Sequence, residues 1–230
     1  MKEKLYFIPG LMCDERLWSR MAPYLENKYE LIYLNIPHTL NFDEMSEIIN
    51  EQIKEDNSKL VGFSLGGYAS LYFSLKYPNK ISKLYLLAAS GSVSSQKEIN
   101  RRREMMIASR EYDFCAPTID KIKTLIDENS YDDKEMISII QDMFLDLGRD
   151  TFEMQLQATF ERENLLEKVI NNDKPLHIIY GDKDRLVDDN WIKLLEEKRD
   201  KNISFTCIET TSHNIPLDFP KEISEILLKD

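Results

Sequence analysis

Short apolar runs alternate with amphipathic stretches along most of the chain. The runs are continuous rather than alternating in polarity, which is typical of strands buried on both faces of a parallel sheet. They cover residues 5–9, 29–36, 59–63, 81–88, 176–180 and 203–208. Between them, apolar residues recur at helical spacing. This order predicts an α/β fold with a mostly parallel sheet of about six strands and helices on both faces.

Polar residues and prolines mark the expected helix boundaries. Asp14 can cap a helix that continues to Leu25, and either Asn41 or Asp43 can cap the next one. Pro220 suits the first turn of a closing helix, because its missing N–H would have no partner there.

The alternation breaks between residues 92 and 166, where helical patterns occur without a strand. We expect this segment to be an inserted helical lid on a core made of residues 1–91 and 167–230. The alternative is a helical subdomain with no role in binding. A lid is favoured because the segment leaves and rejoins the sheet at the carboxyl ends of its strands, where ligands bind in such folds.

Composition narrows the classes of function. Hydrophobic residues make up 42% and charged residues 31% of the chain, an ordinary globular balance. The formal net charge of −11 argues against general nucleic-acid binding. No apolar run has the length of a membrane span or a signal-peptide core, and three scattered cysteines form neither a disulfide framework nor a zinc motif. We therefore expect a cytoplasmic protein without a metal or cofactor.

The stretch from Gly62 to Gly66 carries the strongest catalytic motif. It reads G-x-S-x-G with Ser64 at its centre, after an apolar run and before a helical pattern. This context is that of a nucleophile elbow, a sharp turn that exposes a serine hydroxyl. We expect glycine at Gly62 and Gly66 because neighbouring backbone passes close to them. The alternative is a surface serine in a glycine-rich turn.

A serine nucleophile needs a base, and the chain has three histidines. His213 follows the last predicted strand, at the sheet edge that also holds Ser64, so it is the expected base. His177 lies inside a strand and His38 in a loop, where structural roles are commoner.

The carboxylate that orients this base should follow the preceding strand. Asp182 and Asp184 both lie in that turn. Asp184 is favoured because it is deeper in the turn, whereas Asp182 can cap the turn through its own backbone.

Two backbone N–H groups are candidates for stabilising an oxyanion. One belongs to Leu65, directly after Ser64, and the other to Leu11, where Gly10 allows a close approach. Cys13 follows this loop, but no base is placed for it, so we expect it to line a pocket.

These motifs resemble those of α/β-hydrolases over nearly the whole chain. The matching segments are Pro9-Gly10-Leu11 through Trp18, Gly62 to Gly67, Gly181 to Asp184 and Ser212-His213. The resemblance implies a Ser64–Asp184–His213 triad, an oxyanion hole at Leu11 and Leu65, and a helical lid. Two departures are evident. Many members have His-Gly where this chain has Pro9-Gly10, and the usual sheet has eight strands, so the first two are missing here.

The resemblance also implies the reaction, which is hydrolysis of a carboxylic ester or thioester through an acyl-enzyme on Ser64. One branch of the family demethylates pimeloyl groups on acyl carrier protein. Arginines at the start of the expected lid could contact such a carrier or phosphopantetheine, although nearby glutamates also fit a solvated helix face. Pocket candidates are Met12, Cys13, Arg101, Arg102, Phe144 and Phe160.

Two other functions stay open. A branch of the family uses the same three residues for an elimination in menaquinone synthesis, without an acyl-enzyme. A third possibility is a non-catalytic binding protein with this fold. The complete set of Ser64, Asp184 and His213 argues against it, because degenerate relatives often lose one member.

Overall fold

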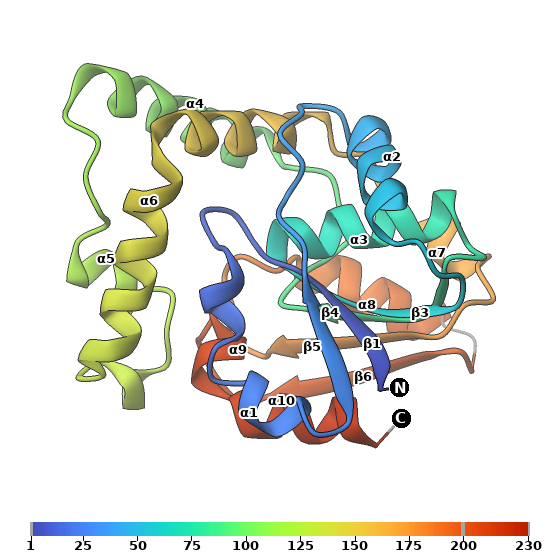
Figure 1. Cartoon of the computed structure of the whole chain (residues 1–230). Helices are drawn as coiled ribbons and strands as arrows, with labels where there is room; N and C mark the ends of the chain where they lie inside the picture. Colours follow the sequence, from blue (N-terminus) through green and yellow to red (C-terminus); the bar gives the residue numbers. More distant parts are fainter. Residues whose placement is uncertain (1, 199–200, 230) are drawn as a thin grey trace.

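The computed structural model describes residues 2–198 and 201–229. Its centre is a parallel sheet in the order β2-β1-β3-β4-β5-β6 (Figure 1). The strands are β1 (Glu3–Ile8), β2 (Tyr29–Tyr33), β3 (Ser58–Phe63), β4 (Ile81–Leu87), β5 (Leu176–Gly181) and β6 (Ile203–Ile208). The predicted α/β class and strand number are therefore confirmed.

Helices cover both faces of this sheet (Figure 1). On one side lie α2 (Phe42–Gln52) and α3 (Ser64–Lys76), and on the other α1 (Ala22–Leu25) and α10 (Pro220–Leu228). Further helices are α7 (Leu166–Ile170), α8 (Asp189–Lys198) and α9 (Ile215–Asp218). The carboxyl-terminal parts of the central strands β3 and β4 are buried on both faces, which explains why their sequences are continuously apolar there.

The direction of chain winding reverses next to β1. From β1 the chain goes outwards to the edge strand β2, then returns past β1 to form β3. Loops at the carboxyl ends of β1 and β3 therefore diverge, and such a switch point is where α/β folds bind ligands.

The prediction of one continuous helix from Asp14 to Leu25 is wrong. Residues 14–25 form two short helices, a 3₁₀ turn η1 (Glu15–Trp18) and then α1. Pro23 lies in the first turn of α1, and its ring and missing N–H prevent one helix from continuing through this point. Asp14 caps η1 by accepting a hydrogen bond from the Arg16 N–H at 3.0 Å. Asn41, rather than Asp43, caps α2.

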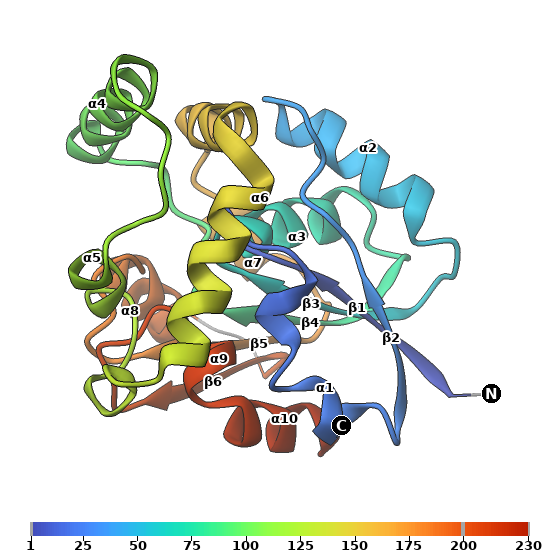
Figure 2. The ribbon, with the colours of Figure 1, turned by 60° about the vertical axis from the view of Figure 1, so that its left-hand side comes forward.

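Residues 92–166, hereafter the insertion, contain helices and loops but no strand. Its longer helices are α4 (Gln96–Glu111), α5 (Ile119–Lys123) and α6 (Lys134–Ala158), with 3₁₀ turns η2 (Glu128–Ser130) and η3 (Thr159–Glu161). The longest of these helices, α6, bends at Gly148, where φ is 75°. α4 packs against α6, away from the end of the sheet where the chain begins (Figures 1 and 2). Among the described helices, none is both long and apolar enough to cross a bilayer.

Candidate active site

Ser64 occupies a strained turn between β3 and α3. Its φ is 51°, in the left-handed region that non-glycine residues rarely adopt. A Cβ at Gly62 would lie 2.4 Å from the Ser70 Oγ, and one at Gly66 would lie 2.0 Å from the Pro9 carbonyl oxygen. The expected need for glycine on both sides of Ser64 is thus confirmed, because any side chain would collide with the packed elements.

The structure brings Ser64, His213 and Asp184 into one hydrogen-bonded chain. His213 Nε2 lies 2.9 Å from Ser64 Oγ, and His213 Nδ1 lies 2.7 Å from Asp184 Oδ2. The other Asp184 oxygen accepts the Leu186 N–H at 2.9 Å. When Nδ1 carries the ring proton, its N–H donates a hydrogen bond to the Asp184 carboxylate. Nε2 is then unprotonated and can accept the proton of the Ser64 hydroxyl.

This chain is largely shielded from water. The Asp184 side chain is 1% exposed and the His213 side chain 11% exposed. The ring of Phe63 covers the imidazole at a centroid distance of 5.2 Å. Such enclosure strengthens each polar interaction in the chain, because less water competes for its donors and acceptors.

The rejected candidates have other environments. His177 Nε2 lies 2.9 Å from the Thr206 Oγ1 across β5 and β6, and His38 is exposed. Asp182 accepts the Thr210 N–H at 2.9 Å, so it fixes the loop that leads to His213 rather than its own turn. This corrects the expected cap at Asp182.

The loop after β1 turns directly beside the nucleophile. The Cys13 N–H donates to the Gly10 carbonyl at 3.1 Å, and Met12 has φ of 56°. A Cβ on Gly10 would come within 3.1 Å of the Ser64 Cβ, so the turn from Gly10 to Cys13, hereafter the oxyanion turn, faces Ser64. Within the described residues, the Leu11 N–H forms no backbone hydrogen bond.

Leu65 supplies a second N–H at the same place. It is the second residue of α3, and the first N–H groups of a helix have no intrahelical acceptor. Together with the Leu11 N–H, it gives two donors near Ser64. Donors of this kind stabilise a developing oxyanion when they point at its position.

A residue of the insertion holds the oxyanion turn in place. The Gln155 Oε1 accepts the Met12 N–H at 2.8 Å, and Gln155 is 3% exposed. Sequence reasoning missed this contact. The available signal was a polar residue on the apolar face of α6, beside Phe152 and Leu156.

An apolar cluster covers the oxyanion turn. Met12, Phe152 and Leu156 are buried together, with Phe144 and Phe114 packed at their edge. The Phe144 ring lies 4.9 Å from that of Phe114 and 5.3 Å from that of Phe152. We call these five residues the acyl cluster; sequence reasoning missed Phe114, Phe152 and Leu156.

The other pocket candidates lie elsewhere. Cys13 packs against the main core, and burial, with the Asp14 charge adding, raises the pKa of its thiol to about 12. It therefore stays a protonated thiol at neutral pH, as expected for a residue without a base. Phe160 lies under the Arg103 guanidinium at 5.4 Å rather than in the acyl cluster.

The insertion also holds the loop that carries His213. The backbone N–H groups of His213 and Asn214 both donate to the Leu125 carbonyl, at 3.1 and 3.0 Å. Asp127 accepts the Thr210 hydroxyl at 2.5 Å. Burial by itself raises the pKa of Asp127, but hydrogen bonds from Thr210 and Asn129 outweigh it and hold this pKa below its ordinary value.

The arginines of α4 do not form one patch. Arg101 and Arg103 are exposed. Arg102 is half-buried and donates hydrogen bonds to Ser94 Oγ at 2.7 Å and to Glu98 Oε1 at 3.4 Å. Arg110 pairs with Glu153 at 2.7 Å through its Nε.

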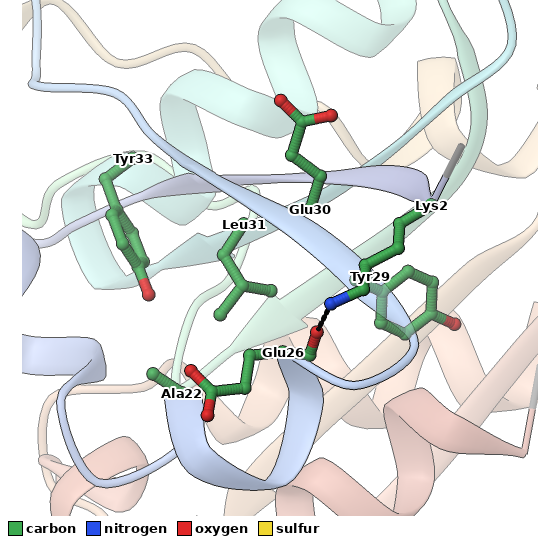
Figure 3. Close-up of a pocket in the computed structure, with 7 residues that line it drawn as sticks. All are labelled: Lys2, Ala22, Glu26, Tyr29, Glu30, Leu31 and Tyr33. Atoms are coloured by element: carbon green, nitrogen blue, oxygen red, sulfur yellow. Dashed lines mark hydrogen bonds between the residues drawn. The ribbon is translucent and has the colours of Figure 1, made fainter.

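A hollow of about 470 Å³ lies away from these residues (Figure 3). It runs along the outer edge of β2 and reaches Lys2 and Tyr29, beside the amino end of the sheet. Its lining holds neither serine nor histidine, and the parallel strands carry Ser64 to the opposite end. Across the described part of the chain, no three His, Cys, Asp or Glu side chains are grouped to hold a metal ion.

Comparison with known proteins finds similar chains. The chain is similar to the uncharacterized hydrolase YugF of Bacillus subtilis, with 23% identity over 97% of this chain and 88% of that one. It is also similar to a Haemophilus influenzae protein named "Putative 2-succinyl-6-hydroxy-2,4-cyclohexadiene-1-carboxylate synthase", with 21% identity over 98% and 97% of the two chains.

Solved structures share the fold. A thermophilic esterase from Thermogutta terrifontis with malate bound superposes with a TM-score of 0.85, at 17% identity over 100% of this chain and 89% of that one. The family model described as serine aminopeptidase, S33, matches residues 38–219, which include Ser64, Asp184 and His213. The chain therefore belongs to the serine aminopeptidase S33 family of α/β-hydrolases.

Proposed function

We propose that this protein is a serine hydrolase that cleaves a carboxylic ester or thioester, with Ser64 as nucleophile, His213 as base and Asp184 as the orienting acid. The observation that carries the proposal is the continuous hydrogen-bonded chain from Asp184 through His213 to Ser64, at 2.7 and 2.9 Å. A serine hydroxyl becomes a useful nucleophile only with such a base, and the base needs a partner that fixes its tautomer.

In the first half-reaction, Ser64 Oγ attacks the acyl carbonyl carbon while its proton moves to His213 Nε2. The N–H groups of Leu11 and Leu65 stabilise the oxyanion, and each such donor contributes about 2.7–4 kcal/mol in comparable hydrolases. The tetrahedral intermediate then collapses. The proton on His213 passes to the leaving alcohol or thiol, which departs and leaves an acyl group on Ser64.

In the second half-reaction, water attacks the acyl-enzyme as His213 takes its proton. The acid departs and Ser64 recovers its hydrogen from His213. The acyl cluster, whose Met12 belongs to the oxyanion turn, suits the hydrocarbon part of an acyl group.

The experiment is to label the protein with a fluorophosphonate probe and to assay p-nitrophenyl esters of increasing chain length. We expect labelling and turnover by the wild type, and both should be lost in Ser64→Ala, with turnover reduced about a thousandfold or more. The variant should keep its thermal unfolding midpoint, since no core volume changes. Retained turnover in a folded Ser64→Ala protein would identify a different nucleophile.

A second candidate is elimination by the same three residues, with Ser64 acting as a base rather than as an acyl carrier. The similarity to the Haemophilus influenzae protein favours it, because both chains match over almost their full lengths. A protein that is labelled by fluorophosphonate yet turns over neither esters nor thioesters would support elimination and overturn the hydrolase proposal.

A further inference from the structure

The carboxylate of Asp218 lies beside the loop that carries His213, hereafter the His213 loop. Asp218 is the last residue of α9, and its backbone N–H donates to the Asn214 carbonyl at 3.1 Å, which keeps it close to this loop. Its Oδ2 accepts the hydroxyl of Ser212, the residue before His213. The same oxygen accepts the Asp127 N–H at 3.1 Å. One carboxylate oxygen therefore joins the His213 loop to the insertion.

The Ser212 side chain depends on Asp218 for its acceptor. Ser212 is 0% exposed, so water does not replace a missing partner. Its hydroxyl has two protein acceptors within reach, the Asp218 carboxylate and the Leu125 carbonyl, the latter at 3.4 Å. A hydroxyl donates a single proton, and an ionised carboxylate is the stronger acceptor. The proton of Ser212 is therefore donated to Asp218.

The Leu125 carbonyl is already occupied by other donors. It accepts the His213 N–H, the Asn214 N–H and the Asn214 side-chain amide, at 3.1, 3.0 and 3.2 Å. A carbonyl oxygen has two lone pairs, so a further donor would compete with these three groups. The His213 loop thus has two separate anchors: the Leu125 carbonyl holds its backbone, and Asp218 holds the side chain next to the base.

The carboxylate at Asp218 does not strengthen the fold. Its Oδ1 is buried and has no hydrogen-bond partner among the described residues. Burial raises the pKa of the Asp218 carboxyl, and the Asp127 charge acts in the same direction. Hydrogen bonds from Ser130, Ser212 and the Asp127 N–H oppose this rise without cancelling it. At neutral pH the charge therefore disfavours the folded state, so stability gives no reason for a carboxylate here. An acceptor for Ser212 does.

We propose that Asp218 is a positioning residue for His213. By anchoring Ser212 it fixes the backbone from which the imidazole extends, so that the ring stays within hydrogen-bond reach of Ser64. A base that moves away from its hydroxyl loses much of its effect, because proton transfer needs close contact. The effect on turnover rests on the function proposed for Ser64, whereas the effect on the position of His213 does not.

The kinetic test is Asp218→Ala, which removes the anchor. The rate of fluorophosphonate labelling and kcat for a p-nitrophenyl ester should both fall about tenfold, with little change in KM. Asp218→Asn keeps an acceptor oxygen and should recover part of both rates. Glu222→Gln removes an exposed charge from α10 and is the matched control, which should keep wild-type rates. An unchanged labelling rate in Asp218→Ala, or an equal loss in the control, would overturn the inference.

Substitution of the partner tests whether Ser212 carries the effect. Ser212→Ala by itself should slow labelling about as much as Asp218→Ala. The two substitutions together should cause no further loss, because both remove one hydrogen bond. Losses that multiply in the double variant would show that Asp218 acts by another route.

Thermal unfolding separates positioning from a structural role. A carboxyl whose pKa is raised in the folded state contributes stability that is lost as pH rises through that pKa. At pH 7, the neutral and equally large Asp218→Asn should therefore unfold at the wild-type temperature or higher. A marked fall in its midpoint would show that the residue mainly holds the fold, and would count against the proposal.

Proton NMR measures the position of His213 without turnover. The Nδ1–H that donates to Asp184 should give a strongly deshielded signal in the wild type. Asp218→Ala should broaden this signal or shift it upfield, while Glu222→Gln should leave it unchanged. If this result is obtained and the wild type hydrolyses no ester, the positioning role stands and the hydrolase proposal fails. A wild-type signal in Asp218→Ala would overturn the inference.

Discussion

Individual side chains that do no chemistry themselves control the geometry around Ser64. Gln155 is the clearest case, because its buried amide oxygen accepts the Met12 N–H within the oxyanion turn. Met12 has a positive φ that a non-glycine residue adopts at a cost, so the turn depends on neighbours that hold it. The same turn presents the Leu11 N–H.

Replacing Gln155 by alanine should therefore lower kcat about tenfold with little change in KM. The N–H groups would be misplaced rather than removed, so the loss should be smaller than that for a deleted oxyanion donor. Affinity for a trifluoromethyl ketone that mimics the tetrahedral intermediate should fall by the same factor. Gln155→Glu keeps an acceptor oxygen and should recover part of the rate, while exposed Gln157→Ala on the same helix is the control. An unchanged kcat in Gln155→Ala would show that the turn holds itself.

His213 sets the expected dependence of the rate on pH. The imidazole accepts the Ser64 proton only when it is neutral, so kcat/KM should rise as the pH is raised from acid and then level off. The acidic limb should have a slope of about one, because one proton blocks the reaction. Initial rates on a neutral ester measure this, since such a substrate does not titrate. A flat profile would be inconsistent with His213 as base.

At the scale of elements, the insertion is attached to both catalytic loops. α6 holds the oxyanion turn through Gln155, and the segment after α5 holds the His213 loop through the Leu125 carbonyl and Asp127. Residues far apart in the chain thus fix the two sides of one site. The bend of α6 at Gly148 lets its two limbs follow different directions, one beside α5 and one beside α4 (Figure 1).

Asp127→Asn should lower both the unfolding midpoint at pH 7 and kcat, the latter several-fold. A carboxylate whose pKa is lowered in the folded state stabilises the protein above the ordinary aspartate pKa, near 3.9, and this stability is lost as pH falls through the lowered value. The difference in midpoint between wild type and variant should therefore shrink below about pH 4. Circular dichroism melts at several pH values measure this. Exposed Asp120→Asn on α5 removes the same charge and is the control; an equal effect in both variants would rule out a specific role for Asp127.

At the scale of the whole molecule, charge limits which partners can approach. The chain has 41 acidic and 30 basic residues, so an acidic carrier protein would be repelled by the net charge of −11. Attraction would have to be local, and Arg101 and Arg103 are exposed on α4. We propose that these two residues are the contact if the acyl group is delivered by such a carrier.

Combined substitution Arg101→Glu and Arg103→Glu should lower kcat/KM at least fivefold for a carrier-bound acyl substrate. The effect on the same acyl group as a free methyl ester should be much smaller. Added salt should weaken the wild-type preference for the carrier, because exposed charges are screened. Equal losses on both substrates would argue against carrier recognition through α4.

The sequence by itself determined the parallel sheet, the elbow at Ser64 and the order of the three polar side chains. Local patterns suffice for these, because continuous apolar runs, the glycine spacing around Ser64 and the loop after each strand can each be recognised within a short segment. Choosing Asp184 over Asp182 from the sequence was harder. Both residues are aspartates in the same turn, and they differ only in the direction in which the turn points each side chain.

The tertiary structure alone decided how the insertion meets the core. Gln155 and Met12 are 143 residues apart, and Leu125 and His213 belong to different layers. Arg162 lies over the Tyr68 ring at 4.6 Å, and nothing in either local sequence indicates this contact. Such contacts depend on how the helices of the insertion pack on the core. The apolar face of a helix can pack in many ways, so its sequence does not fix which residues it contacts.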